Sequence, residues 1–222
     1  MHRYKNIVII GTSHIAQESI SQVEKTITLE APDLVALELD KARYHALTTS
    51  TKRRPTLKDI THLGFKGWLF AVFGELAERK LGNKVGVSPG TEMLKAAVTA
   101  RANNCSIALI DQPLDVTLKK FSKSITWKEK FRFLKDLLFS PFSKQKISID
   151  LTKVPEQKLV QHLIKQLKTR YPNVHKTLVE DRNKYMAKNL LKLTKHFKKI
   201  VAVVGAGHEK ELVEELKKIE TD

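Results

Sequence analysis

The feature that most constrains this chain is a set of four short apolar runs rich in β-branched residues, each followed directly by polar residues. The first two runs are separated by a segment of helical length, in which apolar residues recur at intervals of four, three and four. Two strands joined by a helix of this length lie parallel, with a right-handed crossover. The runs are Ile7–Ile10, Leu34–Leu37, Ser106–Ile110 and Ile200–Val204, and the helical stripe is Ala16, Ile20, Val23 and Ile27.

The polar residues after these runs are expected to meet at one edge of a sheet. The first and last runs end in Gly-x-x-His, with histidines at His14 and His208. The second run ends in Glu38, and the third ends in Asp111. Open α/β sheets bind their ligands at the carboxyl ends of parallel strands, so this edge is the predicted site.

We therefore predict an α/β fold with a central, mostly parallel mixed sheet flanked by helices on both faces. A long helical insertion, about residues 112–199, is expected before the last strand, and residues 1–222 are expected to form a single domain. No apolar run approaches the roughly 20 residues of a membrane-spanning helix, and no signal peptide is recognisable, so no transmembrane domain is predicted. The single cysteine, Cys105, suits a reducing compartment, and we expect a cytoplasmic protein.

The formal net charge of +16 is large and invites a nucleic-acid or anionic-membrane partner. A lysine-rich, solvated surface explains the same charge, and no DNA- or RNA-binding motif accompanies it, so nucleic acid is the less favoured partner. An anionic membrane surface and a second copy of the chain, in a homodimer, are the other candidate partners.

Two segments combine aromatic residues with either apolar or basic neighbours. Residues 65–81 are the most aromatic part of the chain and predict a core helix, or alternatively a lid or wall of an apolar groove that touches membrane. Residues 119–146 hold nine basic and two acidic residues, interleaved with Trp127, Phe131 and Phe133. This second pattern suits RNA or lipid head groups, but an amphipathic surface helix is the preferred interpretation.

A helix predicted from about Val174 to Lys199 carries an arginine on its apolar face. Its lysines form one stripe, and Met186 belongs to an apolar stripe on the opposite side. Arg182 lies four residues before Met186 and therefore shares the buried side. A buried guanidinium needs an anionic partner, which is either a site carboxylate or a substrate anion. The alternative is a simple surface salt bridge.

Two imidazoles and a carboxylate at one sheet edge suit a divalent metal ion: Mn, Co, Zn or Fe. His14, His208 and Glu38 are the predicted metal ligands, and a metal with an open position activates water and polarises a carbonyl. Glu92, after a helix start predicted at Ser88 and Pro89, is a further candidate general base. The alternatives are that the histidines are ordinary polar or capping residues, that Glu92 complements a helix dipole, and that Asp40 caps a helix. Gly205-Ala206-Gly207 resembles half of a dinucleotide-binding fingerprint but lacks its third glycine, so a dinucleotide site is the less favoured interpretation.

Six segments in order along the chain resemble the TraB/PrgY family, which includes pheromone-shutdown proteins and many archaeal and bacterial members. The paired Gly-x-x-His motifs with acidic segments between them carry the resemblance, which spans nearly the whole chain. This family is distantly similar to the Tiki proteins, which are metal-dependent proteases, and to ChaN and erythromycin-esterase-like proteins. The segments are IVIIGTSHIAQESISQVEKTI, PDLVALELDKARYHAL, GVSPGTEMLKAAVTA, IALIDQPLDVTLKK, LVEDRNKYMAKNLL and IVAVVGAGHEKELVEEL.

The resemblance implies a set of functional residues and also shows three departures from the family pattern. Gln112 stands where the family often has arginine, Asp181 stands where it usually has glutamate, and the C-terminal membrane spans of many relatives are not found before Asp222. The implied catalytic residues are Glu38, Glu92 and Arg182, the metal ligands are His14, His208 and Glu38, and the substrate-binding residues are Arg43, Asp111 and Arg182.

The best functional prediction is a metal-dependent hydrolase, most specifically a peptidase, that acts on peptide or small-molecule substrates. The resemblance to pheromone-shutdown proteins supports an alternative, a non-catalytic protein that sequesters a peptide or signal in the same cleft. A third hypothesis, a nucleic-acid binder that uses the lysine-rich helices, predicts a steep dependence of binding on salt.

Overall fold

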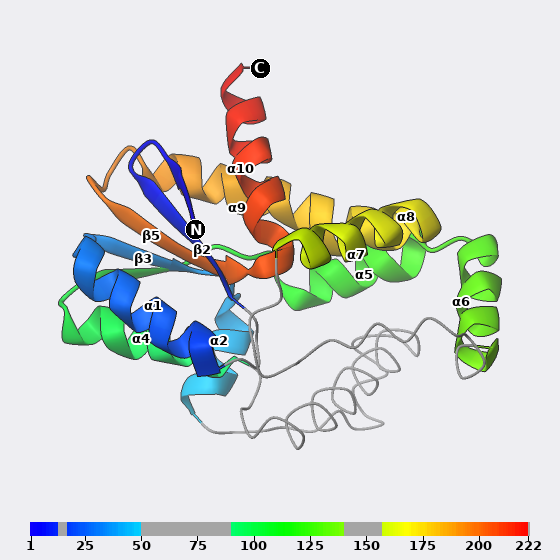
Figure 1. The fold of residues 1–222 in the computed structure, drawn as a ribbon, viewed down its shortest axis with the longest axis horizontal. Helices are drawn as coiled ribbons and strands as arrows, with labels where there is room; N and C mark the ends of the chain where they lie inside the picture. The colour runs from blue at the N-terminus through cyan, green and yellow to red at the C-terminus, as the bar shows by residue number, and fades with distance from the viewer. Residues whose placement is uncertain (13–16, 50–89, 140–156, 222) are drawn as a thin grey trace.

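The computed structural model describes residues 1–12, 17–49, 90–139 and 157–221. Within these ranges the chain forms a five-stranded sheet in the order β1-β2-β5-β3-β4, with helices on both faces (Figure 1). The predicted fold class is confirmed. The strands are β1 (His2–Tyr4), β2 (Ile7–Thr12), β3 (Leu34–Leu37), β4 (Ser106–Leu109) and β5 (Ile200–Gly205).

The sheet is parallel except at one edge. The neighbouring strands β2, β5, β3 and β4 are parallel, whereas β1 runs antiparallel to β2. A tight turn joins β1 to β2, with Lys5 in the left-handed region at φ 49°. The sequence analysis did not predict β1, because three alternating residues before a turn carry too little periodicity to identify a strand.

Helices cover both faces, which explains why the strands are continuous apolar runs instead of alternating ones. Successive side chains of a strand point to opposite faces, so β2 contributes Val8 and Ile10 to one core and Ile7 and Ile9 to the other. The first core is completed by α1 (Gln17–Glu30) and α4 (Thr91–Ala102), and the second by α9 (Asp181–Leu193) and α10 (Ala206–Thr221).

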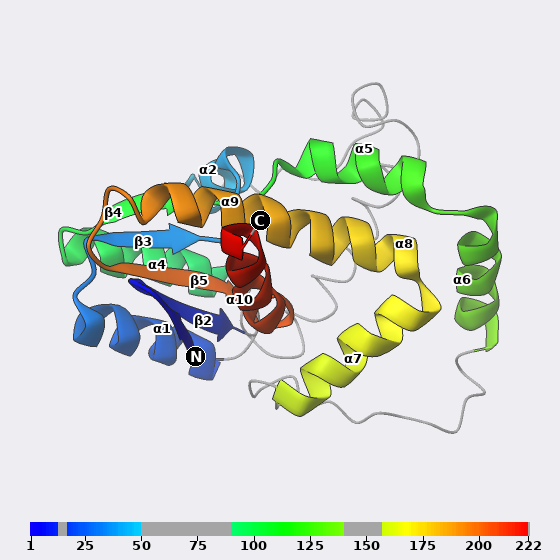
Figure 2. The same cartoon turned by 90° about the horizontal axis from the view of Figure 1, so that it is seen from above.

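The described parts of the segment between β4 and β5, residues 110–139 and 157–199, are largely helical, as predicted, and extend away from the sheet (Figure 2). Its last part was predicted as one helix from Val174 to Lys199. The structure has one continuous helical run here, from Pro172 to Leu193, with the π-helical turn η3 in its middle, so the helix ends before Lys199. The helices of the insertion are α5 (Leu114–Ser124), α6 (Trp127–Phe139), α7 (Gln157–Arg170), α8 (Pro172–His175), the π-helix η3 (Lys176–Glu180) and α9.

The helix that carries Glu92, α4, begins at Thr91 in the described part of the chain. Gly90, at φ 87°, is its N-cap residue. Glycine adopts this left-handed conformation without the steric penalty of a Cβ atom, so it fixes the start of the helix here.

Several predictions concern residues outside the described ranges. The aromatic segment 65–81, the predicted helix start at Ser88 and Pro89, and His14 all belong to this group. Within the part of the chain that the structure describes, no helix has the length and apolar character needed to cross a bilayer.

Candidate functional site

Arg182 is the centre of a buried polar cluster at the carboxyl edge of the sheet. Its side chain, 16% exposed, comes from the first turn of α9 and contacts groups from three other elements. The Arg182 Nε donates to Asp111 Oδ1 at 3.0 Å, and Nη2 donates to Asp111 Oδ2 at 2.6 Å and also to Glu38 Oε1. The Arg182 Nη1 lies 3.1 Å from His208 Nε2. One guanidinium therefore joins residues that are far apart in the sequence.

The π-helix η3 directly before α9 helps to position this arginine. Single π-helical turns are rare and occur frequently at functional sites. Here the turn ends at Glu180, two residues before Arg182. The Arg182 Nη1 also donates to the carbonyl of Leu178 in this turn, at 3.3 Å. The local backbone thus holds the guanidinium toward the sheet edge.

A second arginine reinforces the Asp111 carboxylate. Arg43, in α2 (Lys41–Thr48), donates from Nη2 to Asp111 Oδ2 and from Nε to Asp40 Oδ2 at 2.8 Å. Asp40 is also the N-cap of α2, accepting from the backbone N–H of Arg43 at 2.9 Å. The capping role predicted as an alternative for Asp40 is confirmed, and the same carboxylate also orients Arg43.

Glu38 follows β3 directly and is held at both carboxylate oxygens. Its Oε2 accepts from the backbone N–H of Gly205 at 2.6 Å, and its Oε1 accepts from Arg182. The side chain is 4% exposed. Gly205 is the last residue of β5, the strand next to β3, so the parallel pairing of these strands places the donor beside the carboxylate.

His208 is oriented by an amide on one side and faces the cluster on the other. Its Nδ1 lies 2.7 Å from Asn183 Oδ1, while its Nε2 lies 3.4 Å from Glu38 Oε1. An amide oxygen can only accept a hydrogen bond and a guanidinium can only donate one, so the contacts with Asn183 and Arg182 favour the neutral tautomer with hydrogen on Nδ1. The Nε2 lone pair then points into the cluster.

The charges of the cluster stabilise one another. Burial by itself lowers the pKa of the Arg182 guanidinium, but the carboxylates of Glu38 and Asp111 outweigh it and raise that pKa above its ordinary value. Arg182 is therefore a permanent cation. It needs both carboxylates, because an unpaired buried charge is strongly destabilising.

The polar network continues beyond His208 through α9 and α10. The Asn183 Nδ2 donates to Glu211 Oε2 at 3.3 Å, and Glu211 Oε1 lies 3.4 Å from His175 Nε2. His175, at 1% exposure, also has its Nδ1 3.2 Å from Glu180 Oε1. This series of contacts connects the π-helix to His208 by a second path, independent of Arg182.

The two Gly-x-x-His motifs follow neighbouring strands. Gly11 pairs with Val204 and Thr12 pairs with Gly205, so the first glycines of the two motifs are offset by one position across the β2–β5 pair. A Cβ atom at Gly11 would overlap the carboxylate of Glu209, so a larger residue at this position would require the Glu209 side chain to move.

A cleft of about 380 Å³ adjoins this edge of the sheet, between α7 and α10. Gly11, Ala206 and Gly207 belong to its walls at the sheet, and α7 contributes Ile164. The charged lining residues are Lys165, Lys168, Glu209, Lys210, Glu211 and Glu214. Glu211 therefore belongs both to the cleft and to the network that orients His208.

The structure brings together five of the seven residues predicted for the site: Glu38, Arg43, Asp111, Arg182 and His208. Glu92 is buried in the first turn of α4, and no hydrogen bond among the described residues connects it to this cluster. His14 lies outside the described ranges. Within those ranges, no group of three or more histidine, cysteine, aspartate or glutamate side chains is arranged to hold a metal ion.

Sequence reasoning missed four members of the network. Asn183 directly follows Arg182, so its place beside the site could have been suspected. His175 and Glu211 carry no motif, and only the packing of α8, η3 and α10 brings them together. Gly205 was considered only as the first residue of a Gly-x-x-His motif and of an incomplete dinucleotide fingerprint, but its backbone N–H also donates to Glu38.

Comparison with known proteins gives a consistent result over nearly the whole chain. The model of the TraB/PrgY/gumN family matches residues 2–220. An uncharacterized protein of Methanocaldococcus jannaschii is 36% identical over 97% of this chain. TraB domain-containing proteins of Homo sapiens and Bos taurus are 24% and 23% identical, each over 91% of this chain.

The matched region is only a part of each of these relatives. The chain spans 54% of the length of the archaeal protein and 60% of the length of the two mammalian proteins. Since the family match covers almost all of this chain, the chain belongs to the TraB/PrgY/gumN family.

Proposed function

We propose that this protein is a metal-dependent hydrolase with peptides as its substrate class, and that Glu38, Arg182 and His208 form its reaction centre. The observation that carries the proposal is the convergence of His208 Nε2 and Glu38 Oε1, 3.4 Å apart, at the carboxyl edge of a parallel sheet. The peptide class rests on the resemblance to Tiki proteases. The single cysteine supports a reducing compartment such as the cytoplasm.

The proposed ion is divalent, such as Mn, Co, Zn or Fe. It would take the place of the Arg182 guanidinium beside His208 Nε2 and Glu38 Oε1, because both atoms contact that guanidinium in this structure. Histidines that bind metals usually donate their other ring N–H to an acceptor, and Asn183 Oδ1 supplies that acceptor for His208. Glu38 Oε1 would be the second ligand, and His14 would be the third. Bound here, the metal would lower the pKa of a water ligand and polarise a substrate carbonyl.

The protein residues have separate roles in this proposal. By resemblance to the family, Arg182 is the cation that would hold a substrate carboxylate or a developing oxyanion. Its five N–H groups all contact protein groups in this structure, so a substrate anion would have to replace one of these contacts. Glu38 is the candidate base for the attacking water because it lies beside His208. Glu92 keeps this role as a second candidate by resemblance to the family. Arg43 fixes Asp111 and thereby supports Arg182.

Elemental analysis of purified protein tests the metal directly. Parent, His14→Ala and His208→Ala are each incubated with Mn, Co, Zn or Fe and analysed, with His196→Ala as the control. His196 is exposed and follows α9 at its far end, so its removal should leave metal binding unchanged. We expect near-stoichiometric metal in the parent and the control, and loss of metal in both site variants.

A peptide library with the metal-loaded parent tests the reaction. Products that form with the parent and the His196→Ala control, but not with His208→Ala or Arg182→Lys, would support the proposal. Absence of metal binding with all four ions would refute the metal-dependent mechanism. Stoichiometric peptide binding by the metal-loaded parent without any product would instead support the sequestering function.

A further inference from the structure

Helix α6 has an unusual orientation relative to the rest of the molecule. Trp127, Phe131 and Phe133 are 73%, 67% and 61% exposed, whereas the carboxylate residue Glu129 is only 4% exposed. At 3.6 residues per turn, Glu129 and Asp136 lie about 180 to 200° around the helix from Trp127. The side of α6 that carries Glu129 and Asp136 therefore faces the protein, and Trp127 and Phe131 face outward. Phe133 lies on the side of Glu129, where its ring contacts Tyr171.

Hydrogen bonds of Glu129 and Asp136 and one aromatic contact hold α6 in this orientation. The aromatic contact is between the rings of Phe133 and Tyr171, with centroids 6.5 Å apart. Both oxygens of Glu129 are used: Oε1 accepts from the Asn173 N–H at 2.8 Å, and Oε2 accepts from Asn173 Nδ2 at 3.0 Å. Asp136 accepts from Arg170 Nε at 2.6 Å and also binds the hydroxyl of Tyr171. These contacts attach α6 to the end of α7 and the start of α8.

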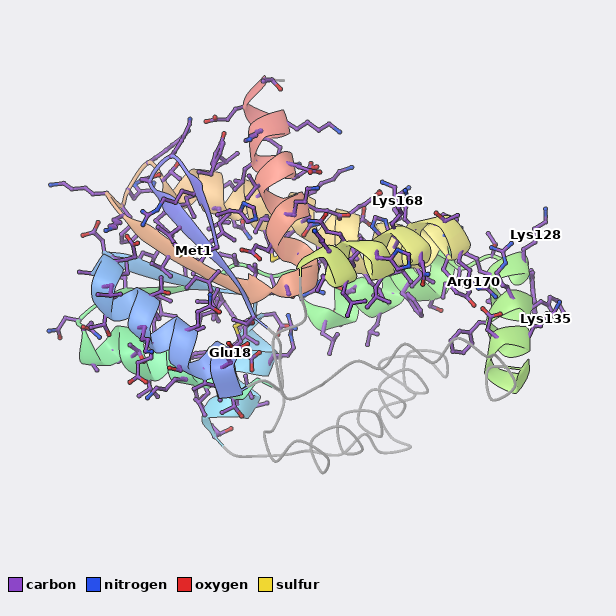
Figure 3. All side chains as sticks on the ribbon, viewed as in Figure 1. Met1, Glu18, Lys128, Lys135, Lys168 and Arg170 are labelled. Atoms are coloured by element: carbon purple, nitrogen blue, oxygen red, sulfur yellow. The ribbon has the colours of Figure 1, made fainter. Side chains whose placement is uncertain are left out.

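The same contacts leave the outward charge of α6 entirely positive. Both of its acidic side chains are engaged with α7 and α8, whereas Lys128 and Lys135 are exposed (Figure 3). Lys130 places its ammonium 4.5 Å from the centre of the Trp127 ring, a cation–π contact at the surface. Aromatic rings flanked by lysines are typical of helices that lie in a membrane interface.

We propose that α6 is a docking helix for an anionic lipid surface, with Trp127 and Phe131 entering the head-group region and Lys128, Lys130 and Lys135 binding phosphates and carboxylates. Trp127 and Phe131 are four residues apart and form one stripe. The helix has 13 residues and is about 20 Å long at 1.5 Å per residue, so it would lie on a bilayer and not cross it.

The place of α6 in the molecule suits this role. It stands at the end of the helical insertion farthest from the sheet, in both views of the molecule (Figures 1 and 2). The proposal does not depend on the proposed hydrolase, because no residue of α6 belongs to the Arg182 cluster. Lipid is favoured over nucleic acid because the aromatic and basic groups accompany each other on one short amphipathic helix and no nucleic-acid motif is present.

Vesicle sedimentation with the full chain tests the proposal. The vesicles are phosphatidylcholine alone, or phosphatidylcholine mixed with phosphatidylserine. We expect binding only to the phosphatidylserine vesicles, and weaker binding as salt rises. The fluorescence of Trp127 is obtained as the difference between the parent and Trp127→Phe. Its emission should shift to shorter wavelength on these vesicles. In solution without vesicles, acrylamide should quench it freely.

Two pairs of variants separate α6 from the general positive charge. Lys128→Glu/Lys135→Glu should lower the vesicle partition coefficient by at least about tenfold. Lys217→Glu/Lys218→Glu makes the same charge change on exposed positions of α10 and should have little effect. Trp127→Ala/Phe131→Ala should also weaken binding, whereas Leu29→Ala, at an 83% exposed position of α1, should not. All changed positions are exposed, so circular dichroism should show folded proteins.

Four results would overturn the proposal. One is no binding of the parent to phosphatidylserine vesicles at low salt. Another is equal loss of binding in the α10 control pair, which would make the effect one of net charge. The third is Trp127 shielded from acrylamide in solution, which would mean that another segment or a second copy covers α6. Binding of DNA or RNA that is lost in the α6 variants, without any vesicle binding, also counts against it.

Discussion

Helices α9 and α6 have the same length and are both amphipathic. The apolar side of α9 faces the protein core, whereas Trp127 and Phe131 of α6 face outward. The helix α9 buries Met186, Ala187 and Leu190 in the core that it forms with α10 on one face of the sheet. In contrast, α6 buries Glu129 and exposes Trp127 and Phe131. Hydrophobic burial is non-directional and scales with area, so it holds α9 in place, whereas directional hydrogen bonds hold α6.

The difference shows how each helix can serve a site. A helix fixed by close packing can hold a charged group at a defined point, and α9 does this for Arg182 and Asn183. A helix fixed by a few polar contacts leaves its apolar side available to another surface. The predictions below test this contrast, from the largest expected effect to the smallest.

The largest effect is expected at Arg182. Arg182→Ala would leave Glu38 and Asp111 without their shared cation, and a broken buried ion pair costs about 3–5 kcal/mol. Lys184→Ala, at an exposed position of the same helix, should change stability by less than about 0.5 kcal/mol. Urea unfolding of both variants measures the difference. Equal stabilities would mean that the cluster contributes nothing to the fold.

Truncation of one apolar side chain on each helix tests the contrast itself. Leu190→Ala removes a fully buried side chain and should cost about 2–5 kcal/mol. Phe131→Ala removes a larger side chain that is 67% exposed and should cost less than about 0.5 kcal/mol. Thermal and urea unfolding provide the measurement. A large cost at Phe131 would show that its ring is packed in the folded protein, and the contrast would fail.

Replacement of the buried carboxylate in α6 should have an intermediate effect. In Glu129→Gln the amide NH₂ would face an N–H donor. We therefore expect the free energy of opening of α6, measured by hydrogen exchange, to fall by about 1–3 kcal/mol. Amide hydrogen exchange of α6 at neutral pH measures this loss. Unchanged exchange would mean that other contacts hold the helix.

The same residue makes a pH prediction. Burial by itself raises the pKa of Glu129, but hydrogen bonds from Asn173 and Thr126 outweigh it and hold that pKa below its usual value of 4.5. The folded-state pKa is the lower one, so the stabilisation is present above about pH 4.5 and is lost as the pH falls through the lowered pKa. The protection factors of the α6 amides, which correct for the pH dependence of intrinsic exchange, should therefore fall in acid in the parent. The difference in protection between the parent and Glu129→Gln should narrow at the same time.

The smallest expected effect distinguishes two asparagines. Asn183 binds His208 and Asn173 binds Glu129, and replacement of either by alanine should cost about 1 kcal/mol. Only Asn183→Ala should change the tautomer of His208, which nitrogen-15 NMR of the imidazole reports. Asn173→Ala should change only the exchange of α6. A His208 signal that is the same in the parent and in Asn183→Ala would show that the amide does not orient the ring.

Much of the fold followed from periodicity, and part of the site followed from the ends of the strands. The four apolar runs indicated four parallel strands, because strands covered on both faces are apolar throughout. Arg182 was expected to need an anionic partner because it shares a side of its helix with Met186. The structure supplies two, Glu38 and Asp111, along with a π-helical turn that no sequence pattern indicated.

The sequence pattern did not predict which side of α6 faces outward. Its sequence was correctly interpreted as amphipathic, but amphipathicity says only that two sides differ, and the usual assumption turns the apolar side inward. The tertiary contacts of Glu129 and Asp136 reverse that assumption.

The sequence by itself determined the α/β class, the family and the identity of most charged groups at the sheet edge. These properties depend on local periodicity and on the ends of strands, which neighbouring residues specify. Only the tertiary structure decided which carboxylates share Arg182, which nitrogen of His208 faces them and which side of α6 is exposed. Those outcomes depend on contacts between residues far apart in the chain, such as Arg182 with Glu38, and such contacts form only when the whole core packs.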